Sequence, residues 1–355
     1  MRIPITGIGV IAPGAIGIEA FRALLASGAS AVTDVDRFDT RGLSAHRAAL
    51  VRDFRPKEFI PVMKMRRMNG LSRLGVAAAK LAIEDCGGSL PPETGVAIGT
   101  AFGPVQTSVE YMQEYVEKGA ALAPPQLFAE SVANAPGSHI AIEWGLRGFN
   151  VTITQRESSA LAAAMVAATQ LAKGSVRAVL IGGVEEANEM LFSVLDRVGA
   201  LAHDDRPGII LGEGGAVLVA GAGTRKPYGW LAGFGISRDT TAPISDWGHD
   251  EKSVITAMKA ALDDAELPST DAIFVSANGS PRCDDLEERA IREMFGDAMP
   301  LVPTKHIFGE YAAGGALQIV AALVALDEGR YDSLLVNAIS AGGGIVCAVL
   351  TRGAG

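Results

Sequence analysis

Two glutamates stand at matching places in this sequence, each directly before a long segment rich in Ala, Leu and Val. Glu157 precedes SSALAAAMVAATQLAKGSVRAVLIGG, and Glu310 precedes YAAGGALQIVAALVALDEGRYDSLLVN, so each is predicted to open a helix that leads into a strand. A helix N-terminus carries roughly +0.5 elementary charge and unpaired N–H groups, so it commonly holds an anion, an oxyanion or a nucleophile. The chemistry open to this protein therefore depends on what stands at these two helix starts.

The two matching segments belong to a longer duplication. ITGIGV at 5–10 resembles LAGFGI at 231–236, and the segment 82–103 resembles 261–280, in the same order along the chain. Three matches in one order indicate that two copies of one unit have been fused.

Each copy predicts an α/β unit. Strands rich in Val, Ile and Gly alternate with apolar helices, which is typical of a mostly parallel sheet covered on both faces. We therefore expect two halves, 1–222 and 223–355, whose stacked sheets enclose the helices after Glu157 and Glu310. The first half carries extra material, and the proline-containing part at 104–150 predicts a helical cap.

Composition excludes several classes of function. The chain has 355 residues, 48% of them hydrophobic, and its longest apolar runs stop short of the roughly 20 residues that span a membrane. No signal-peptide pattern opens the sequence, so we expect a cytoplasmic protein. The three cysteines and five histidines lack metal-ligand spacing, and a net charge of −9 argues against general nucleic-acid binding.

One basic cluster stands out against this acidic background. It comprises Lys64, Arg66, Arg67 and Arg73. Such a cluster is either a solvated helix face or a docking surface for an acidic partner, and the sequence leaves both readings open.

Ten segments spread along nearly the whole chain carry recognisable motifs: ITGIGVIAP at 5–13, RRMNGLSRLGVAAA at 66–79, GVAIGTAFG at 95–103, SVANAPGSHIAIEWGLRG at 131–148, the turn region at 153–162, IGGVEEA at 181–187, DDRPGIILGEGGA at 204–216, VSANGS at 275–280, PTKHIFGEYAAGG at 303–315 and NAISAGGG at 337–344. Together these segments resemble the β-ketoacyl synthases of the thiolase fold. The resemblance implies a thiolase-like, five-layered duplicated α-β-α-β-α fold and a dimer whose interface includes the strand leading into the nucleophile turn. It also implies substrates on the phosphopantetheine arm of an acyl carrier protein, with no other cofactor.

The chain departs from this family at every catalytic position. Where active members place the acyl-accepting cysteine, this sequence has Glu157, preceded by Arg156. The motif of the first histidine here carries Asn278, and that of the second keeps its lysine, Lys305, but has Glu310 in place of the histidine.

These substitutions predict that the chain does not condense acyl groups by itself. A carboxylate that attacks a thioester gives a short-lived mixed anhydride, and Asn278 can donate a hydrogen bond but cannot carry a proton. Two buried acids cannot both stay charged at low cost without cations. We therefore expect an ion-pair network that joins Lys305 to both Glu157 and Glu310, with Arg156 as a second partner for Glu157.

Two further segments bear on function. The loop that carries a mobile phenylalanine in active members here has no aromatic residue, which indicates either a gate that no longer moves or simply a tight turn; its residues are Ile339, Ala341, Gly342 and Gly343. Residues of the cap are expected to line the subunit interface or the end of an acyl tunnel, although they could equally be ordinary core; they are Phe102, Tyr111, Met112, Phe128 and Asn134.

Three functions fit this pattern. The leading hypothesis is a non-catalytic subunit, similar to the chain-length factor of type II polyketide synthases, that pairs with an active ketosynthase and shapes the tunnel for a polyketide or fatty-acid-like chain such as an aryl polyene. Such factors often carry Gln at the cysteine position, so Glu157 departs from them too. The alternatives are a decarboxylase that primes chains from malonyl carrier protein, and a homodimeric scaffold or binding protein.

Overall fold

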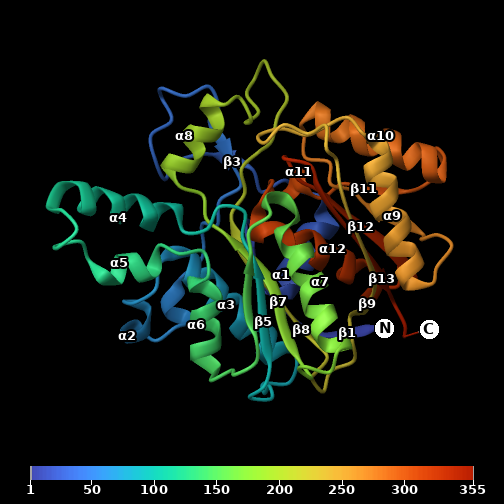
Figure 1. Ribbon diagram of the computed structural model, residues 1–355, viewed down its shortest axis with the longest axis horizontal. Helices are drawn as coiled ribbons and strands as arrows, with labels where there is room; N and C mark the ends of the chain where they lie inside the picture. Colours follow the sequence, from blue (N-terminus) through green and yellow to red (C-terminus); the bar gives the residue numbers. More distant parts are fainter. Residues whose placement is uncertain (1, 355) are drawn as a thin grey trace.

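A computed structural model describes residues 2–354, which form one large mixed sheet, a separate two-stranded sheet of β3 and β4, and the helices that cover the large sheet (Figure 1). The strands are β1 (Ile3–Ala12), β2 (Ala15–Ile16), β3 (Thr33–Asp34), β4 (Arg47–Ala48), β5 (Gly95–Gly99), β6 (Asn150–Ile153), β7 (Val179–Glu185), β8 (Gly214–Ala220), β9 (Gly229–Arg238), β10 (Ala272–Phe274), β11 (Leu301–Val302), β12 (Ser333–Ile339) and β13 (Gly344–Thr351). The helices are α1 (Ile18–Ser27), α2 (Val62–Met65), α3 (Gly70–Asp85), α4 (Val105–Lys118), α5 (Pro125–Glu130), α6 (Ala135–Trp144), α7 (Ser159–Ala172), α8 (Glu189–Arg197), α9 (Glu251–Ala265), α10 (Pro281–Phe295), α11 (Lys305–Phe308) and α12 (Ala316–Asp327). Short 3₁₀ turns occupy Pro56–Glu58, Arg156–Ser158 and Ala312–Gly315.

The predicted duplication is visible in the strand order. The first half runs β6-β5-β7-β8-β1 and the second β11-β10-β12-β13-β9, and the halves join where β1 pairs with β9, Ile3 lying opposite Leu231. Strand directions repeat as well, because β5 is parallel to β6 and β7, just as β10 is parallel to β11 and β12.

The sheet is more mixed than the sequence pattern predicted. In each half the last two strand pairs are antiparallel, namely β7–β8 and β8–β1, and β12–β13 and β13–β9. A short loop between β12 and β13 requires this direction, since a parallel partner needs a crossover of a dozen residues or more. Periodicity alone did not distinguish the two cases, because strands buried on both faces look alike in sequence.

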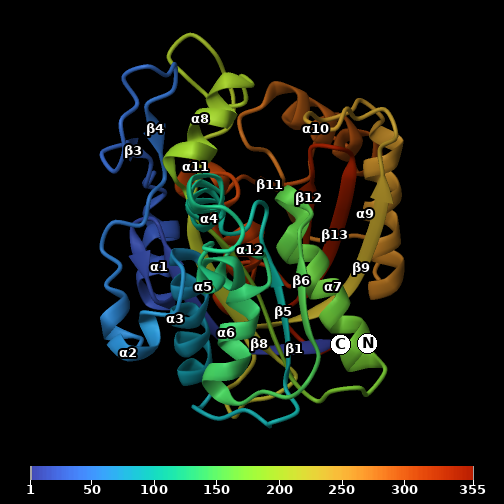
Figure 2. The same ribbon diagram turned by 60° about the vertical axis from the view of Figure 1, so that its left-hand side comes forward.

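Five layers result from the way the two halves face each other, which confirms the thiolase-like fold. Helices α7 and α12 lie in the middle, and α12 contacts β8 and β1 of one half as well as β13 and β9 of the other. Outside them, α3 packs on β1 and β8, and α9 packs on β9 and β13 (Figures 1 and 2). Every residue of α12 from Ala316 to Leu326 is buried, which explains why Gln318 is the one polar residue in that stretch.

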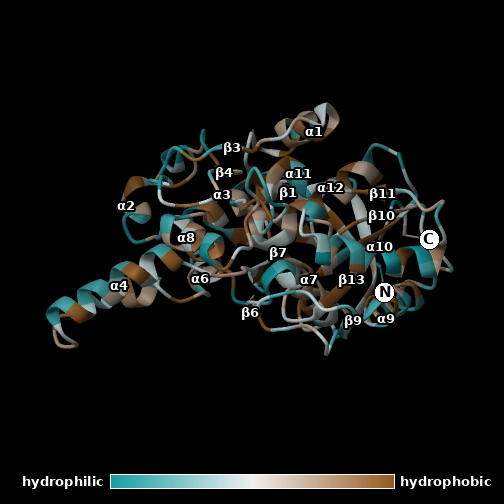
Figure 3. Ribbon diagram, turned by 90° about the horizontal axis from the view of Figure 1, so that it is seen from above, coloured by the Kyte–Doolittle hydropathy of each residue, from teal (hydrophilic) through white to brown (hydrophobic). Residues whose placement is uncertain are grey.

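The predicted cap consists of α4, α5 and α6. Figure 3 shows α4 extending away from the body, with hydrophobic residues in brown among hydrophilic ones in teal. Of the helices in residues 2–354, none has both the length and the apolar character needed to cross a membrane.

Two equivalent glycines let a strand and a helix touch in each half. A Cβ added to Gly9 of β1 would lie 1.9 Å from the carbonyl oxygen of Ala78 in α3, and one added to Gly235 of β9 would lie 1.9 Å from that of Ala257 in α9. The same glycine recurs in both halves because only glycine lets the strand and the helix lie this close together.

We predict that Gly9→Ala lowers the free energy of unfolding by about 3 kcal/mol or more, because the methyl group must push α3 away from β1. Urea denaturation measures the change. Gly42→Ala is the control, since no atom lies within 4 Å of its added Cβ. Equal stabilities for the two variants would contradict the packing role of Gly9.

Candidate functional site

The four residues predicted at the reaction centre come together between the two halves. Glu157 lies in the 3₁₀ turn between β6 and α7, and Asn278 in the loop that joins β10 to α10. Lys305 begins α11, and Glu310 follows that helix. All four are at most 9% exposed.

The prediction that Glu310 opens its helix is wrong. Helix α12 begins only at Ala316, because Tyr311, Ala313, Gly314 and Gly315 have positive φ angles that an α-helix cannot contain. This left-handed turn fits closely against β7. A Cβ added to Gly183 of that strand would lie 2.0 Å from the carbonyl oxygen of Ala313.

Glu310 is held by a closed set of partners, which we call the Lys305 cluster (Asn278, Lys305 and Glu310). Its Oε2 lies 2.7 Å from Lys305 Nζ and accepts a 2.7 Å hydrogen bond from Asn278 Nδ2. Its Oε1 accepts a 2.9 Å hydrogen bond from the backbone N–H of Tyr311. Lys305 also donates to the carbonyl oxygen of Ser276 over 2.8 Å. The polar groups of the cluster therefore satisfy one another.

Burial and charge act in opposite directions on Lys305. Burial lowers the pKa of its amine, but the Glu310 carboxylate outweighs that effect, so the net pKa is raised above the ordinary value. Lys305 therefore remains a cation at neutral pH, as a buried anion beside it requires.

Glu157 does not join this ion pair, which corrects the predicted three-residue network. Its Oε1 accepts a 2.8 Å hydrogen bond from the Tyr311 hydroxyl, and its Oε2 accepts one of 3.1 Å from the backbone N–H of Ala341. Within residues 2–354, neither Lys305 nor Arg156 forms an ion pair with it. The Lys305 amine already donates to Glu310 and to the carbonyl oxygen of Ser276. The side-chain partner of Glu157 is therefore the Tyr311 hydroxyl and not the cation that we expected.

Without a cation, Glu157 holds its proton unusually well. Burial raises its pKa to about 7, and the nearby charge of Glu310 acts in the same direction. Burial and the two acids also raise the pKa of Tyr311 well above its ordinary value, so its hydroxyl stays a neutral donor.

Two buried or half-buried acids hold Asn278 in place. Asp284 accepts the backbone N–H groups of Asn278 and Gly279 over 2.8 and 3.1 Å. Glu287 accepts from the backbone of Ser276 and from the side chain of Asn337, each over 2.9 Å. Asn278 is thereby positioned with its amide toward Glu310.

The loop from Ile339 to Gly343 is fastened to the turn that carries Glu157. Besides the contact from Ala341, Ser340 Oγ accepts from the backbone N–H of Ser158 over 3.1 Å and donates to the carbonyl oxygen of Gln155 over 2.9 Å. Gly342 and Gly343 donate to the carbonyl oxygens of Asp246 and Ser340. The loop therefore has fixed partners at four successive residues.

Sequence reasoning missed Tyr311 and Ser340, although both left a signal. Tyr311 directly follows Glu310, and Ser340 lies within the segment NAISAGGG at 337–344. Each hydroxyl connects the two halves by a hydrogen bond.

The cap residues lie beside this centre and on the outer surface. Phe102 meets the Tyr311 ring edge-on at a centroid distance of 4.8 Å. With Met112, Phe102 lines an open, largely apolar pocket of about 690 Å³ between α4 and α8.

Tyr111 packs against Phe128 at 5.5 Å, while Met112 and Phe128 are 53% and 57% exposed. Asn134 precedes α6 without capping it through its side chain.

Metal-ligand groupings are missing from the part of the chain that the structure describes: residues 2–354 contain no group of three His, Cys, Asp or Glu side chains that could hold an ion. The three cysteines are buried and free.

We predict that Lys305→Met lowers the free energy of unfolding at neutral pH by about 3–5 kcal/mol, because Glu310 then remains as an unpaired buried charge. Adding Glu310→Gln should restore part of this loss. Chemical denaturation of both variants gives the numbers, with Lys80→Met, which removes a largely exposed ion pair, as the control. If Lys305→Met unfolds at the midpoint of the natural sequence, the ion pair does not stabilise the fold.

Glu157 should also make stability depend on pH. An unfolded glutamate loses its proton near pH 4.5, whereas folded Glu157 keeps it to about pH 7, so its contribution is complete below 4.5 and is lost as pH rises to 7. Glu157→Gln should therefore gain stability relative to the natural sequence across this range, by up to a few kcal/mol. Denaturation at several pH values, with the exposed Glu84→Gln as control, checks this. Parallel curves for Glu157→Gln and the natural sequence would show that Glu157 titrates normally.

Comparison with known proteins gives the family. The profile described as "Beta-ketoacyl synthase, N-terminal domain" matches residues 1–223, and "Beta-ketoacyl synthase, C-terminal domain" matches 228–335. The chain is 29% identical to 3-oxoacyl-[acyl-carrier-protein] synthase 2 of Vibrio harveyi, over 92% of this chain and 86% of that one. It is also 29% identical to the tetracenomycin polyketide synthase ketoacyl synthase beta subunit of Streptomyces glaucescens, with the same coverage.

Solved structures share the fold. The ishigamide ketosynthase/chain length factor superposes with a TM-score of 0.89 at 24% identity, covering 99% of both chains. The ketosynthase ApeO in complex with its chain length factor ApeC, from Xenorhabdus doucetiae, gives 0.83 at 19% identity, covering 98% of this chain and 97% of that one. With both halves matched by the family profiles, this chain belongs to the β-ketoacyl synthase family.

Proposed function

We propose that this chain is a non-catalytic member of its family that pairs with an active ketosynthase and acts as the chain-length factor for a polyketide or fatty-acid-like chain built on acyl carrier protein. The observation that carries this proposal is the Lys305 cluster, in which Asn278 and Lys305 both donate to Glu310 instead of facing a substrate.

Acyl transfer needs groups that this centre lacks. A thiolate must accept the acyl group, and donors must hold the enolate that decarboxylation leaves. Glu157 is a poor acyl carrier, and the three cysteine thiols are buried with raised pKa values, so none replaces the missing thiolate. Loss of a nucleophile and base together typically costs on the order of 10⁶ in turnover.

A malonyl decarboxylase receives less support from the same geometry. The Asn278 amide would be the donor to an enolate, but its nitrogen already donates to Glu310. Glu310, paired with Lys305 as an ion, would repel a developing anion.

An exposed face of the first half suits a partner subunit. Strand β6 ends the sheet and, among the described residues 2–354, pairs with β5 alone, which leaves its other edge without a strand partner there. Helix α4 also presents apolar side chains to solvent, with Val116 76% and Met112 53% exposed. Large exposed apolar surfaces commonly mark subunit interfaces. The related complex from Xenorhabdus doucetiae is itself a ketosynthase with its chain length factor.

The pocket between α4 and α8 would receive the end of the growing chain. Its wall is formed by Phe102, Val105, Met112, Val116 and Met190, among others. Phe102 closes the pocket toward Tyr311 and Glu157, so an acyl chain entering from the partner would stop against its ring.

The basic cluster would be the docking surface for the acidic carrier protein. Arg66 and Arg67 are exposed and form no ion pair within residues 2–354, whereas Lys64 is paired with Glu143. Unpaired surface cations attract a partner of opposite charge and speed its association.

Co-expression with a cysteine-bearing ketosynthase from the same genome tests the proposal. We expect a mixed dimer by size-exclusion chromatography with light scattering, and acyl adducts on the partner only by intact mass. Val116→Glu should weaken pairing by about tenfold or more, because a charge would enter the apolar interface. Ile244→Glu, at an 86% exposed position of the second half, is the matched control.

Two results would count against this function. A stable self-dimer that excludes the ketosynthase would indicate a homodimeric scaffold. An acyl adduct on this chain, or chain extension without a partner, would show that the centre is catalytic.

A further inference from the structure

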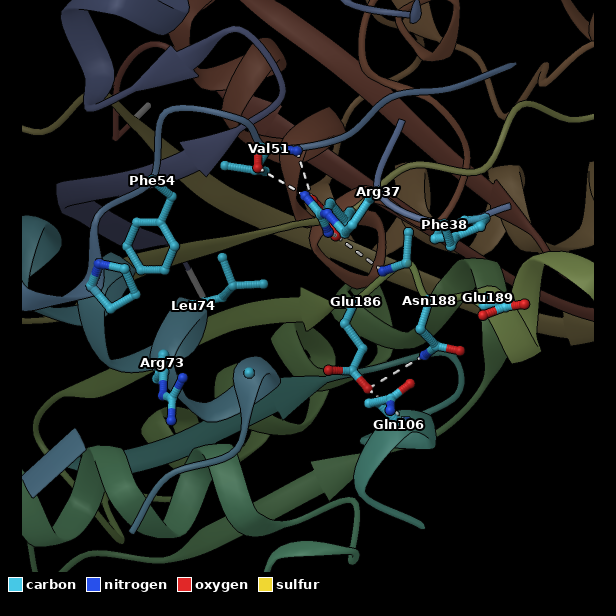
Figure 4. Close-up of a pocket in the computed structure, with 14 residues that line it drawn as sticks. Arg37, Phe38, Val51, Phe54, Arg73, Leu74, Gln106, Glu186, Asn188 and Glu189 are labelled. Atoms are coloured by element: carbon cyan, nitrogen blue, oxygen red, sulfur yellow. Dashed lines mark hydrogen bonds and ion pairs between the residues drawn. The ribbon is translucent and has the colours of Figure 1, made fainter. Parts of the chain in front are cut away.

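A second cavity, of about 470 Å³, shares no lining residue with the Lys305 cluster (Figure 4). It lies between the start of α3, the start of α8 and the loop segment 37–56. Apolar side chains form much of its wall, namely Phe38, Val51, Phe54, Pro56 and Leu74.

An ion pair between Arg37 and Glu213 forms one side of the cavity. Arg37 Nη1 and Nη2 donate to the two oxygens of Glu213 over 2.8 and 2.7 Å. Glu213 also accepts the backbone N–H groups of Val51 and Ala187 over 2.7 and 3.1 Å. The charges of Arg37 and Glu213 therefore compensate each other.

Glu186 and Arg73, by contrast, each keep an unused hydrogen-bonding atom. Glu186 is only 9% exposed, and its Oε1 accepts from the backbone N–H of Gln106 over 3.0 Å, while its Oε2 receives no hydrogen bond within residues 2–354. Arg73 donates from Nη2 to the carbonyl oxygen of Met65 over 3.2 Å, but its buried Nε has no partner. The two side chains do not form an ion pair with each other.

Gly70 places these atoms on one side of the cavity. A Cβ added to Gly70 would lie 3.3 Å from Glu186 Oε2, so this oxygen stands over the first turn of α3. Arg73 follows three residues later on the same face of that helix. Figure 4 shows Arg73 and Leu74 near Phe54 on one side of Glu186, with Phe38 on the other.

From these observations we propose that the cavity binds an aromatic α-amino acid as a zwitterion. The ligand ammonium donates to Glu186 Oε2, its carboxylate pairs with the Arg73 guanidinium, and its ring packs against Phe54 and Leu74. A molecule with one positive and one negative group matches one free anion and one free cation, and leaves neither buried charge uncompensated.

Calorimetric titration of the full chain with L-tryptophan tests this inference, because the two single-charge analogues are available. Tryptamine lacks the carboxylate and indole-3-propionate lacks the ammonium, so we expect each to bind about tenfold more weakly or worse. Glu186→Gln and Arg73→Met should each reduce tryptophan affinity by a similar factor. Lys80→Met, further along α3 and outside the cavity, should leave it unchanged.

The variant Gly70→Ala distinguishes a loss of binding from a loss of folding. Alanine is favoured over glycine in a helix, so thermal stability should be kept or raised while the methyl group crowds Glu186 Oε2 and weakens tryptophan binding. The proposal fails if tryptophan produces no heat and no shift in melting temperature. It also fails if both analogues bind as well as tryptophan, or if Gly70→Ala and Glu186→Gln bind it as the natural sequence does.

Discussion

The buried ion pair between Lys305 and Glu310 is the interaction on which the centre of this molecule depends. Removing two charges from water is costly, and the cost is offset only where the ions lie close together and their remaining hydrogen-bonding atoms are satisfied. Both conditions hold here, since the ions are 2.7 Å apart and Asn278, Tyr311 and the Ser276 carbonyl supply the other bonds. Each neighbour of the pair is thereby fixed to one orientation.

The rest of the site follows from that pair. Because Lys305 is committed to Glu310, Glu157 turns to the Tyr311 hydroxyl and to the backbone of Ala341 instead. These bonds run from the first half of the molecule to the second, since Glu157 belongs to one and Tyr311 and Ala341 to the other. Glu157, Tyr311 and Ala341 thus form a polar junction between the two halves of the fold.

This junction also separates the centre from the apolar pocket under the cap. The Phe102 ring lies against Tyr311, whose hydroxyl is held by Glu157, so the wall of the pocket is supported by the same hydrogen bonds. A wall held in this way keeps its position, as the proposed chain-length function would require. The exposed side chains of Met112 and Val116 in α4 line the same pocket.

The sequence by itself determined the duplicated fold and the two central apolar helices, because internal repeats and runs of apolar residues can be recognised in it directly. It also singled out Glu157, Asn278 and Glu310 as candidate site residues. Only the tertiary structure decided which acid takes the lysine, where α12 begins, and which strands run antiparallel. Those outcomes depend on a left-handed turn at Tyr311 and on contacts between residues far apart in sequence, such as Glu157 with Ala341. The unpartnered Nε of Arg73 could not be predicted either, because a missing partner is a property of three-dimensional packing.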